Sequence, residues 1–151
     1  DLQYKGFNNN LIVRGNAVYG NLGASGALTT INNSSSAASG YPNTTVAQNA
    51  VSYGGEAGYN IGSFFHSKAP RIYPFIRYEY YNPMEKTEAN TGLLADKRFQ
   101  VSAVTAGLNY YALPNLVIKA DYTHRSIGGG KYNDENLVSV GIAYIGWFIK
   151  K

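Results

Sequence analysis

The chain has 151 residues, about the size of one domain, and residues 1–151 are expected to form a single unit. Its 17 glycines and 14 tyrosines favour sheet over helix, and the absence of cysteine excludes disulfides and thiolate metal sites. The net charge of +4 is spread along the sequence without a basic helix, so no nucleic acid is expected as a partner. No run approaches the roughly 20 apolar residues that a membrane-spanning helix needs.

The first third of the sequence contains two short alternating segments and one long polar stretch. Leu2–Phe7 and Leu11–Gly20 alternate apolar with polar residues, the period of two that predicts a β-strand. Residues 21–50 are rich in Gly, Ser, Thr, Asn and Ala, and this stretch is predicted to be a surface loop. A third strand is predicted over Val51–Phe65.

The clearest strand is predicted over Arg71–Tyr81, RIYPFIRYEYY. One alternate set of its residues is apolar or aromatic, and the other set carries every charge of the segment. A strand of about 9 to 11 residues is long enough to cross a bilayer at a tilt. The next strand, Phe99–Tyr111, conflicts in phase near Gln100–Val104, which predicts either a bulge or a later strand start there. Asn115–Arg125 and Leu137–Phe148 complete the series.

The connections between the predicted strands alternate in length. The short ones cover residues 8–10, 66–70 and 112–114, and the long ones cover residues 21–50, 82–98 and 127–136. Short turns at one end and long loops at the other are typical of outer-membrane barrels. The sequence therefore predicts an all-β fold, an antiparallel transmembrane β-barrel.

The predicted strands number seven, whereas closed bacterial barrels have an even number of strands. The chain is therefore expected to be the carboxy-terminal part of a larger barrel, or to share its wall with another polypeptide. An eight-stranded barrel with one strand overlooked is the competing interpretation. A soluble β-sandwich or lipocalin-like carrier is the third.

In a membrane barrel side chains alternate between lipid and lumen, so the charged set of each strand is predicted to line a water-filled bore. Basic side chains there concentrate anions, and facing acids create a transverse field. The alternative is that these charges only solvate the wall. Arg14 and Arg77 are the strongest candidates because each lies in the middle of its strand. The predicted pore-lining residues are Lys5, Arg14, Glu56, Arg77, Glu79, Lys119, Asp121 and Arg125.

Aromatic residues near the predicted strand ends are expected to form the girdles that meet lipid headgroups. The alternative is that they form the core of a soluble sheet. These residues are Tyr78, Tyr80, Tyr110, Tyr122, Tyr144, Trp147 and Phe148.

Three apparent chemical motifs do not predict a site. The segment 128–131, GGGK, lacks the spacing and the following helix of a phosphate loop. Glu79 and Asp121 alternate with basic residues that keep both ionised, so neither is a candidate general acid. His66 and His124 have no ligand-like spacing. No metal, cofactor or catalytic residue is expected, and the chain is predicted not to be an enzyme.

The second half of the chain resembles a known family. YPFIRYEYY from Tyr73, AGLNYYALPNLVIKADY from Ala106 and LVSVGIAYIGWF from Leu137 are similar to the last strands of phosphate-selective porin O/P-like outer-membrane porins. The resemblance implies a larger barrel, commonly a homotrimer, in the outer membrane of a Gram-negative bacterium. It also implies that Arg77, Glu79, Lys119 and Asp121 point inward.

Two functions are compatible with these expectations. The first is a porin for passive diffusion of small hydrophilic solutes, with a slight preference for anions, through a lumen narrowed by an infolded loop at residues 21–50. The second is a small eight-stranded barrel that anchors in the membrane or displays adhesive loops, its interior filled by charged side chains.

Overall fold

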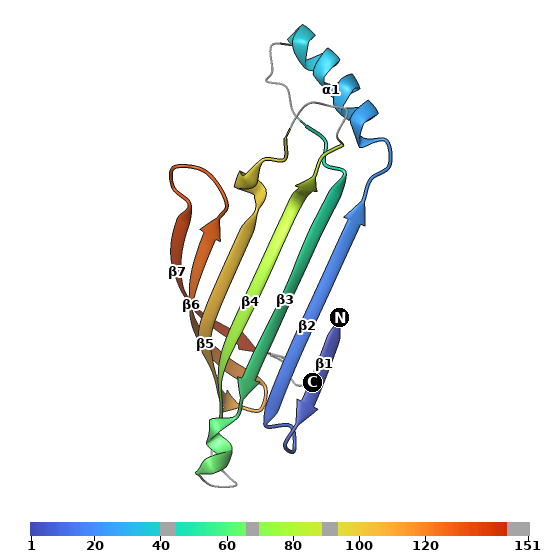
Figure 1. Cartoon of the computed structure of the whole chain (residues 1–151). Coiled ribbons are helices and arrows are strands. Elements are labelled where there is room, and N and C mark those ends of the chain that lie inside the picture. Colours follow the sequence, from blue (N-terminus) through green and yellow to red (C-terminus); the bar gives the residue numbers. More distant parts are fainter. Residues whose placement is uncertain (40–44, 66–69, 89–93, 145–151) are drawn as a thin grey trace, which may run out of the picture.

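The computed structural model describes residues 1–39, 45–65, 70–88 and 94–144. Within these residues, seven strands form one antiparallel sheet, and each strand pairs with its neighbours in sequence. Figure 1 shows the long central strands lying side by side. The strands are β1 (Leu2–Gly6), β2 (Leu11–Asn21), β3 (Asn49–Tyr59), β4 (Arg71–Lys86), β5 (Val101–Leu113), β6 (Leu116–Ile127) and β7 (Asp134–Tyr144), and the helices are α1 (Ser25–Ser39) and the 3-10 turns η1 (Ile61–Phe64) and η3 (Lys97–Phe99).

The two ends of the sheet differ in their connections. We name the end that carries α1 and η3 the loop end, and the opposite end, which carries η1, the turn end (Figure 1). At the turn end β1 and β2 are joined by residues 7–10, and β5 and β6 by Pro114 and Asn115 alone. Phe7, Asn8 and Asn9 all have positive φ, which gives the first turn its tight reversal.

The sheet curves, and its two faces have different chemistry. Arg125 on β6 donates a hydrogen bond from Nη2 to the Tyr81 hydroxyl on β4 at 2.9 Å, although β5 lies between these strands. Contact between side chains two strands apart is favoured on the inner side of a curved sheet. We name this side the concave face and the other the convex face.

Little of the sheet is buried. Val101 and Val117 are the buried apolar residues of the described chain, and both belong to the concave face. The ring of Phe75 lies over Gly107, where an added Cβ would stand 2.6 Å from the ring. Gly107 is therefore the residue that lets a large aromatic side chain lie flat against the concave face.

The described sheet is not closed. β1 and β7 are the two edge strands, and neither pairs with the other. The prediction of seven antiparallel strands in an all-β fold is confirmed, and their boundaries differ from the predicted ones by a few residues where both ends are described. For the last predicted strand, residues 145–148 lie outside the described residues.

The prediction of a loop over residues 21–50 is wrong, because α1 occupies Ser25–Ser39. The start of α1 is held by a residue from another connection: Glu88 accepts hydrogen bonds from the Gly26 amide at 2.5 Å and from the Ser25 hydroxyl at 3.3 Å. A carboxylate at a helix amino terminus satisfies free amides and the helix dipole. In Figure 1 α1 stands beyond the strand ends instead of folding into the concave side, so the expected narrowing loop is also wrong.

Of the two alternatives at Gln100–Val104, the later strand start is confirmed and the bulge is absent: β5 begins at Val101, not Phe99, and pairs with β4 without a shift from there. Register shifts occur instead between Asn49 and Val51 and between Tyr111 and Leu113. Pro74 has no amide hydrogen to donate to a neighbouring strand. It directly precedes Phe75, the first residue of β4 that pairs with β3. A proline is therefore tolerated inside this long strand.

Candidate functional site

The eight predicted pore-lining residues share the concave face. Arg14, Glu56 and Arg77 lie opposite one another on β2, β3 and β4. The same hydrogen-bonded row continues through Thr105 and Thr123. The remaining residues have the same parity as this row on their strands, so their side chains leave the sheet on the same side. They are Lys5, Glu79, Lys119, Asp121 and Arg125.

One carboxylate joins two arginines at the centre of this row. Arg77 donates to Oε2 of Glu56 from Nε at 2.9 Å and from Nη2 at 2.5 Å. Arg14 donates from Nη1 to Oε1 of the same carboxylate at 3.2 Å. Both oxygens of Glu56 are therefore occupied by guanidinium groups, one from each neighbouring strand. We name Arg14, Glu56 and Arg77 the arginine–glutamate cluster.

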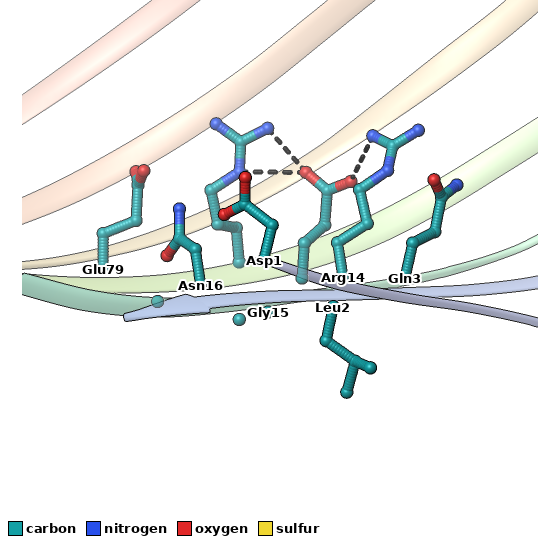
Figure 2. Close-up of a pocket in the computed structure, with 11 residues that line it drawn as sticks. Asp1, Leu2, Gln3, Arg14, Gly15, Asn16 and Glu79 are labelled. Atoms are coloured by element: carbon teal, nitrogen blue, oxygen red, sulfur yellow. Dashed lines mark hydrogen bonds and ion pairs between the residues drawn. The ribbon is translucent and has the colours of Figure 1, made fainter. Parts of the chain in front are cut away.

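The cluster presents positive charge to solvent. The Glu56 side chain is 17% exposed, whereas Arg77 and Arg14 are 41% and 56% exposed. The two arginines and one glutamate carry a net charge of about +1 at neutral pH. They line a hollow of about 440 Å³ together with Asn16 and Glu79. Figure 2 shows Arg14, Asn16 and Glu79 projecting from one side of the strands and Leu2 from the other.

The concave face beyond the cluster mixes polar and apolar side chains and is sparsely charged. The hydroxyls of Thr105 and Thr123 lie 2.8 Å apart and continue the central row across β5 and β6. Asp121 on β6 is near enough to Arg77 for their charges to interact. At the loop end of the same face, Arg125 donates from Nη1 to Oε2 of Glu135 at 2.9 Å. Acids and bases therefore alternate along this wall.

The convex face has the opposite character. Its central row consists of Val13, Ala57, Ile76, Ala106, Tyr122 and Val138. Its apolar side chains are largely exposed, with Val138, Val140 and Ile142 at 74%, 76% and 72%. In water such a continuous apolar surface would be a large uncompensated cost.

On the convex face, a tyrosine lies near the turn end of every strand that runs from the loop end to the turn end. They are Tyr4 on β1, Tyr59 on β3, Tyr110 on β5 and Tyr144 on β7. We compared each tyrosine with the next one of the series, which lies two strands further along the sheet. Relative to the row of paired residues, the later tyrosine is always two residues nearer the turn end. A shift of one residue, about 3.3 Å, for each strand spacing of about 4.8 Å corresponds to a strand tilt of roughly 35°. This is the tilt of strands in closed barrels.

A second series of tyrosines follows a parallel diagonal nearer the loop end. It consists of Tyr19 on β2, Tyr53 on β3, Tyr78 and Tyr80 on β4, and Tyr122 on β6. The rings of Tyr53 and Tyr80 stack with their centroids 4.9 Å apart. We name the two series the turn-end belt and the loop-end belt.

Polar groups on the convex face appear beyond the loop-end belt. Asn136 accepts a hydrogen bond from the Tyr122 hydroxyl at 2.7 Å and lies 3.0 Å from Nδ1 of His124. Glu85 accepts from the Asn82 amide at 2.7 Å at the equivalent level of β4. On the convex face, the paired positions between the two belts carry no Lys, Arg, Asp or Glu in the described strands. Charge on the convex face is thus confined to its rim.

The charged residues of the concave face lie at different levels along the strands relative to the two belts. The arginine–glutamate cluster and Lys119 lie between the two belts, near the middle of their strands. Lys5 adjoins Tyr4 at the turn end, Glu79 lies between Tyr78 and Tyr80, Asp121 adjoins Tyr122, and Arg125 lies beyond Tyr122 toward the loop end. Arg14 and Arg77, which the sequence placed in the middle of their strands, both bind the Glu56 carboxylate.

The aromatic prediction is only partly testable. Tyr78, Tyr80, Tyr110, Tyr122 and Tyr144 all lie on the convex face in the two belts. Trp147 and Phe148 lie outside the described residues. The sequence reasoning missed Tyr4, Tyr19, Tyr53 and Tyr59, although each has the convex parity of its own predicted strand.

Sites of other chemistry are scarce in the described part of the chain. No group of three or more His, Asp or Glu side chains there could hold a metal ion. No helix among the described residues has the length and apolar character that crossing a membrane requires. In the connection before β5, hydrogen bonds from Arg98 lower the pKa of the Asp96 carboxyl, although both groups are exposed.

Comparison with protein-family models, curated proteins and solved structures found no match to this chain. The geometry of the two faces is therefore the basis for a functional proposal.

Proposed function

We propose that the chain forms part of the wall of an outer-membrane porin. Such a porin is a water-filled channel for passive diffusion of small hydrophilic solutes, here with a modest preference for anions. In this proposal the convex face contacts the acyl chains of the bilayer and the concave face lines the bore. The family resemblance of the last strands adds the expectation of a homotrimer in a Gram-negative outer membrane.

The observation that carries the proposal is the contrast between the convex band and its rim. Between the two tyrosine belts the convex face is apolar and exposed, and polar groups begin beyond the loop-end belt. Lipid-facing barrel walls have this order, an apolar band between girdles of aromatic residues. The diagonal course of the belts supports the same interpretation, because strands in a barrel are tilted.

The concave face supports an aqueous bore. Its charged side chains remain partly exposed, and both arginines of the cluster present guanidinium groups toward the hollow. Charges at this level would be costly in lipid but are stable in contact with water. An excess of one positive charge near mid-height raises the local concentration of anions and lowers that of cations.

The test is conductance across a planar lipid bilayer. We expect the protein to give discrete ohmic steps, with an anion permeability slightly above the cation permeability. A preparation that inserts and folds but conducts no current would contradict the porin proposal and favour the anchoring or adhesive barrel. A chain that stays monodisperse in buffer without detergent would contradict both membrane functions.

Replacement of the central acid sharpens the test of selectivity. Glu56→Gln removes one negative charge from the cluster and leaves both arginines in place. For a monovalent ion about 8 Å away in water, one charge changes the free energy by about 0.5 kcal/mol, or about two-fold in permeability. The anion gains this energy and the cation loses it, so we expect the anion-to-cation ratio, measured as a reversal potential in a salt gradient, to rise by about the square of that factor, roughly four- to six-fold.

The matched control is Glu135→Gln, which removes the same charge at the loop-end rim. Glu135 lies three strands from Arg77, and salt screens a charge over a Debye length of about 8 Å at physiological ionic strength, so the ratio is expected to change less. An equal response to both variants would place the selective charge elsewhere.

A further inference from the structure

The hollow beside the arginine–glutamate cluster has a floor of bare backbone at Gly54. In the paired row next to the cluster, Gly54 on β3 lies between Asn16 on β2 and Glu79 on β4. A Cβ added at Gly54 would stand 3.2 Å from Oδ1 of Asn16 and 3.4 Å from Cγ of Glu79. Both side chains therefore border the space above Gly54, and a larger residue at this position would fill it.

One side of this space is positive. Arg77 uses Nε and Nη2 to bind Glu56, so its remaining nitrogen, Nη1, lies on the other edge of the guanidinium and makes no hydrogen bond within the described residues. Arg14 likewise binds Glu56 through Nη1 alone. Guanidinium groups stay charged at physiological pH and bind carboxylates through several N–H donors. The hollow therefore offers free donors for the carboxylate of a solute.

The other side of this space is negative. Glu79 lies two residues beyond Arg77 on β4, so both side chains leave the sheet on the concave face. The exposed Glu79 carboxylate makes no hydrogen bond or ion pair within the described part of the chain, although its charge acts on Arg77. Such a carboxylate can bind an ammonium group, and the neighbouring Oδ1 of Asn16 can accept a further hydrogen bond. The hollow thus presents both signs of charge side by side.

This arrangement disfavours solutes that carry a single charge. Glu79 repels a simple anion near the arginines, and the arginines repel a simple cation near Glu79. The side chains of Arg77 and Glu79 leave β4 about 7 Å apart, and two charge-assisted hydrogen bonds of about 2.8 Å take up most of that span. A solute that bridges them must therefore carry its two charges close together. The ammonium and carboxylate groups of an α-amino acid, separated by one carbon atom, meet this requirement.

We propose that the hollow is a binding site for small zwitterionic solutes of the α-amino acid class. The solute carboxylate accepts hydrogen bonds from Arg77, and its ammonium group donates to Glu79 and Asn16. Glu56 positions Arg77 and does not contact the solute. The Leu2 side chain points to the other side of the strands in Figure 2, so the lining is polar and favours small or polar solute side chains. This inference rests on the proposed channel function and adds the class of solute that binds in the bore.

The test measures binding to the full chain folded in detergent micelles, through the NMR chemical shifts of the Gly54 and Gly55 amides. Three matched solutes are titrated: L-alanine carries both charges, propanoate lacks the amine and ethylamine lacks the carboxylate. An ion pair at about 4 Å in water changes an affinity by about five-fold. We expect L-alanine to bind at least about five-fold more tightly than either analogue. Equal binding of L-alanine and propanoate would overturn the inference, because the hollow would then be a plain anion site.

Three variants identify the carboxylate that binds the ammonium group. We expect Glu79→Gln to weaken L-alanine binding by about five-fold and to leave propanoate binding undiminished. One control, Glu135→Gln, removes a carboxylate of the same face outside the hollow. The other, Asp1→Asn, removes a carboxylate that borders the hollow ahead of β1. Both controls are expected to preserve the ratio of the two affinities, and an equal loss in either one would show that Glu79 does not bind the ammonium group.

Binding in micelles and conductance across a bilayer can fail independently. A chain that binds L-alanine in the hollow but carries no current would contradict the porin and support the binding site. A conducting channel whose Gly54 and Gly55 amides do not respond to L-alanine would support the porin and overturn the binding site.

Discussion

The convex and concave faces are built from alternate residues of the same strands, yet they satisfy polar groups by different means. On the convex face, Val13 and Ala57 are followed outward by tyrosines and only then by polar side chains. On the concave face, the adjacent Arg14 and Glu56 neutralise each other in a charge-assisted pair. The convex face has few charged side chains, whereas the concave face has charged side chains in ion pairs. Neighbouring residues of one strand therefore lie in different environments.

This comparison teaches that residue identity alone is a poor guide to tolerance in this sheet. An arginine is stable at position 77 because Glu56 and water surround it. The same side chain one residue away, at Ile76, would face the convex side, where none of the paired residues between the belts is charged. The face to which a position points therefore decides whether an arginine is tolerated there.

The strongest way to break the comparison is to move a charge between adjacent residues of a central strand. Leu108 is convex and Asn109 is concave, and both lie on β5 between the belts. We expect Leu108→Arg to lower the free energy of unfolding from lipid vesicles by about 2–4 kcal/mol, because in the proposed barrel wall the charge would enter the lipid-facing band. The measurement is urea unfolding followed by tryptophan or tyrosine fluorescence.

The control for that variant is Asn109→Arg. Its side chain enters the concave face near Lys119, so only weak repulsion between solvated charges is expected, below about 1 kcal/mol. If the two arginine variants lose equal stability, the two faces do not differ in environment and the membrane orientation is wrong.

A second prediction concerns crowding on the concave face. Gly107→Val places a side chain where the Phe75 ring now lies, 2.6 Å from the ideal Cβ position. We expect a loss of about 1–3 kcal/mol in the free energy of unfolding, since the ring must leave its position. Gly55→Val, on the convex face, has its nearest neighbour at 3.7 Å and is expected to change stability less.

The double variant Phe75→Ala/Gly107→Val tests the assigned cause. Removal of the ring removes the larger of the two overlaps, so the two changes are expected to be non-additive, with a coupling free energy of about 0.5–3 kcal/mol. Additive losses would show that the neighbouring Asp121 Cβ, at 2.8 Å, causes the strain instead.

The smallest expected effect lies beyond both faces, at the loop end. Glu88→Ala removes the acceptor of the Gly26 amide and the Ser25 hydroxyl, and loss of such a cap costs about 1 kcal/mol. We expect faster hydrogen exchange of the first amides of α1 and unchanged exchange in β2–β6. Glu85→Ala, which leaves these two bonds intact, is the control, and an equal response of α1 to both variants would contradict the capping role.

The strands and the face of each charged residue could be predicted from sequence because a period of two is a local property. The meeting of Arg14, Glu56 and Arg77 could not, since parity gives the face but register decides which residues lie opposite each other. A shift of two residues would keep every side chain on its face and separate the cluster. Register here depends on turns of different length, and two irregularities fall at strand ends.

The helix α1 was missed for a different physical reason. Its sequence, SGALTTINNSSSAAS, is poor in strong helix formers and carries no acid in its first turn. Glu88, which holds its first turn, is distant in sequence. The Thr29 hydroxyl also accepts a hydrogen bond from the Val46 amide at 3.0 Å, a contact equally invisible to a local pattern. Tertiary contacts therefore overrule the turn-forming composition.

The order of strands in space equals their order in sequence, and this has a consequence for the cost of assembly. Joining β5 to β6 closes a connection of only Pro114 and Asn115, whereas joining β2 to β3 closes residues 22–48. Each doubling of loop length adds about 0.6 kcal/mol of closure entropy. The β5–β6 hairpin is thus entropically the least expensive to form, and the wall can grow from it one neighbour at a time without threading any strand between two others.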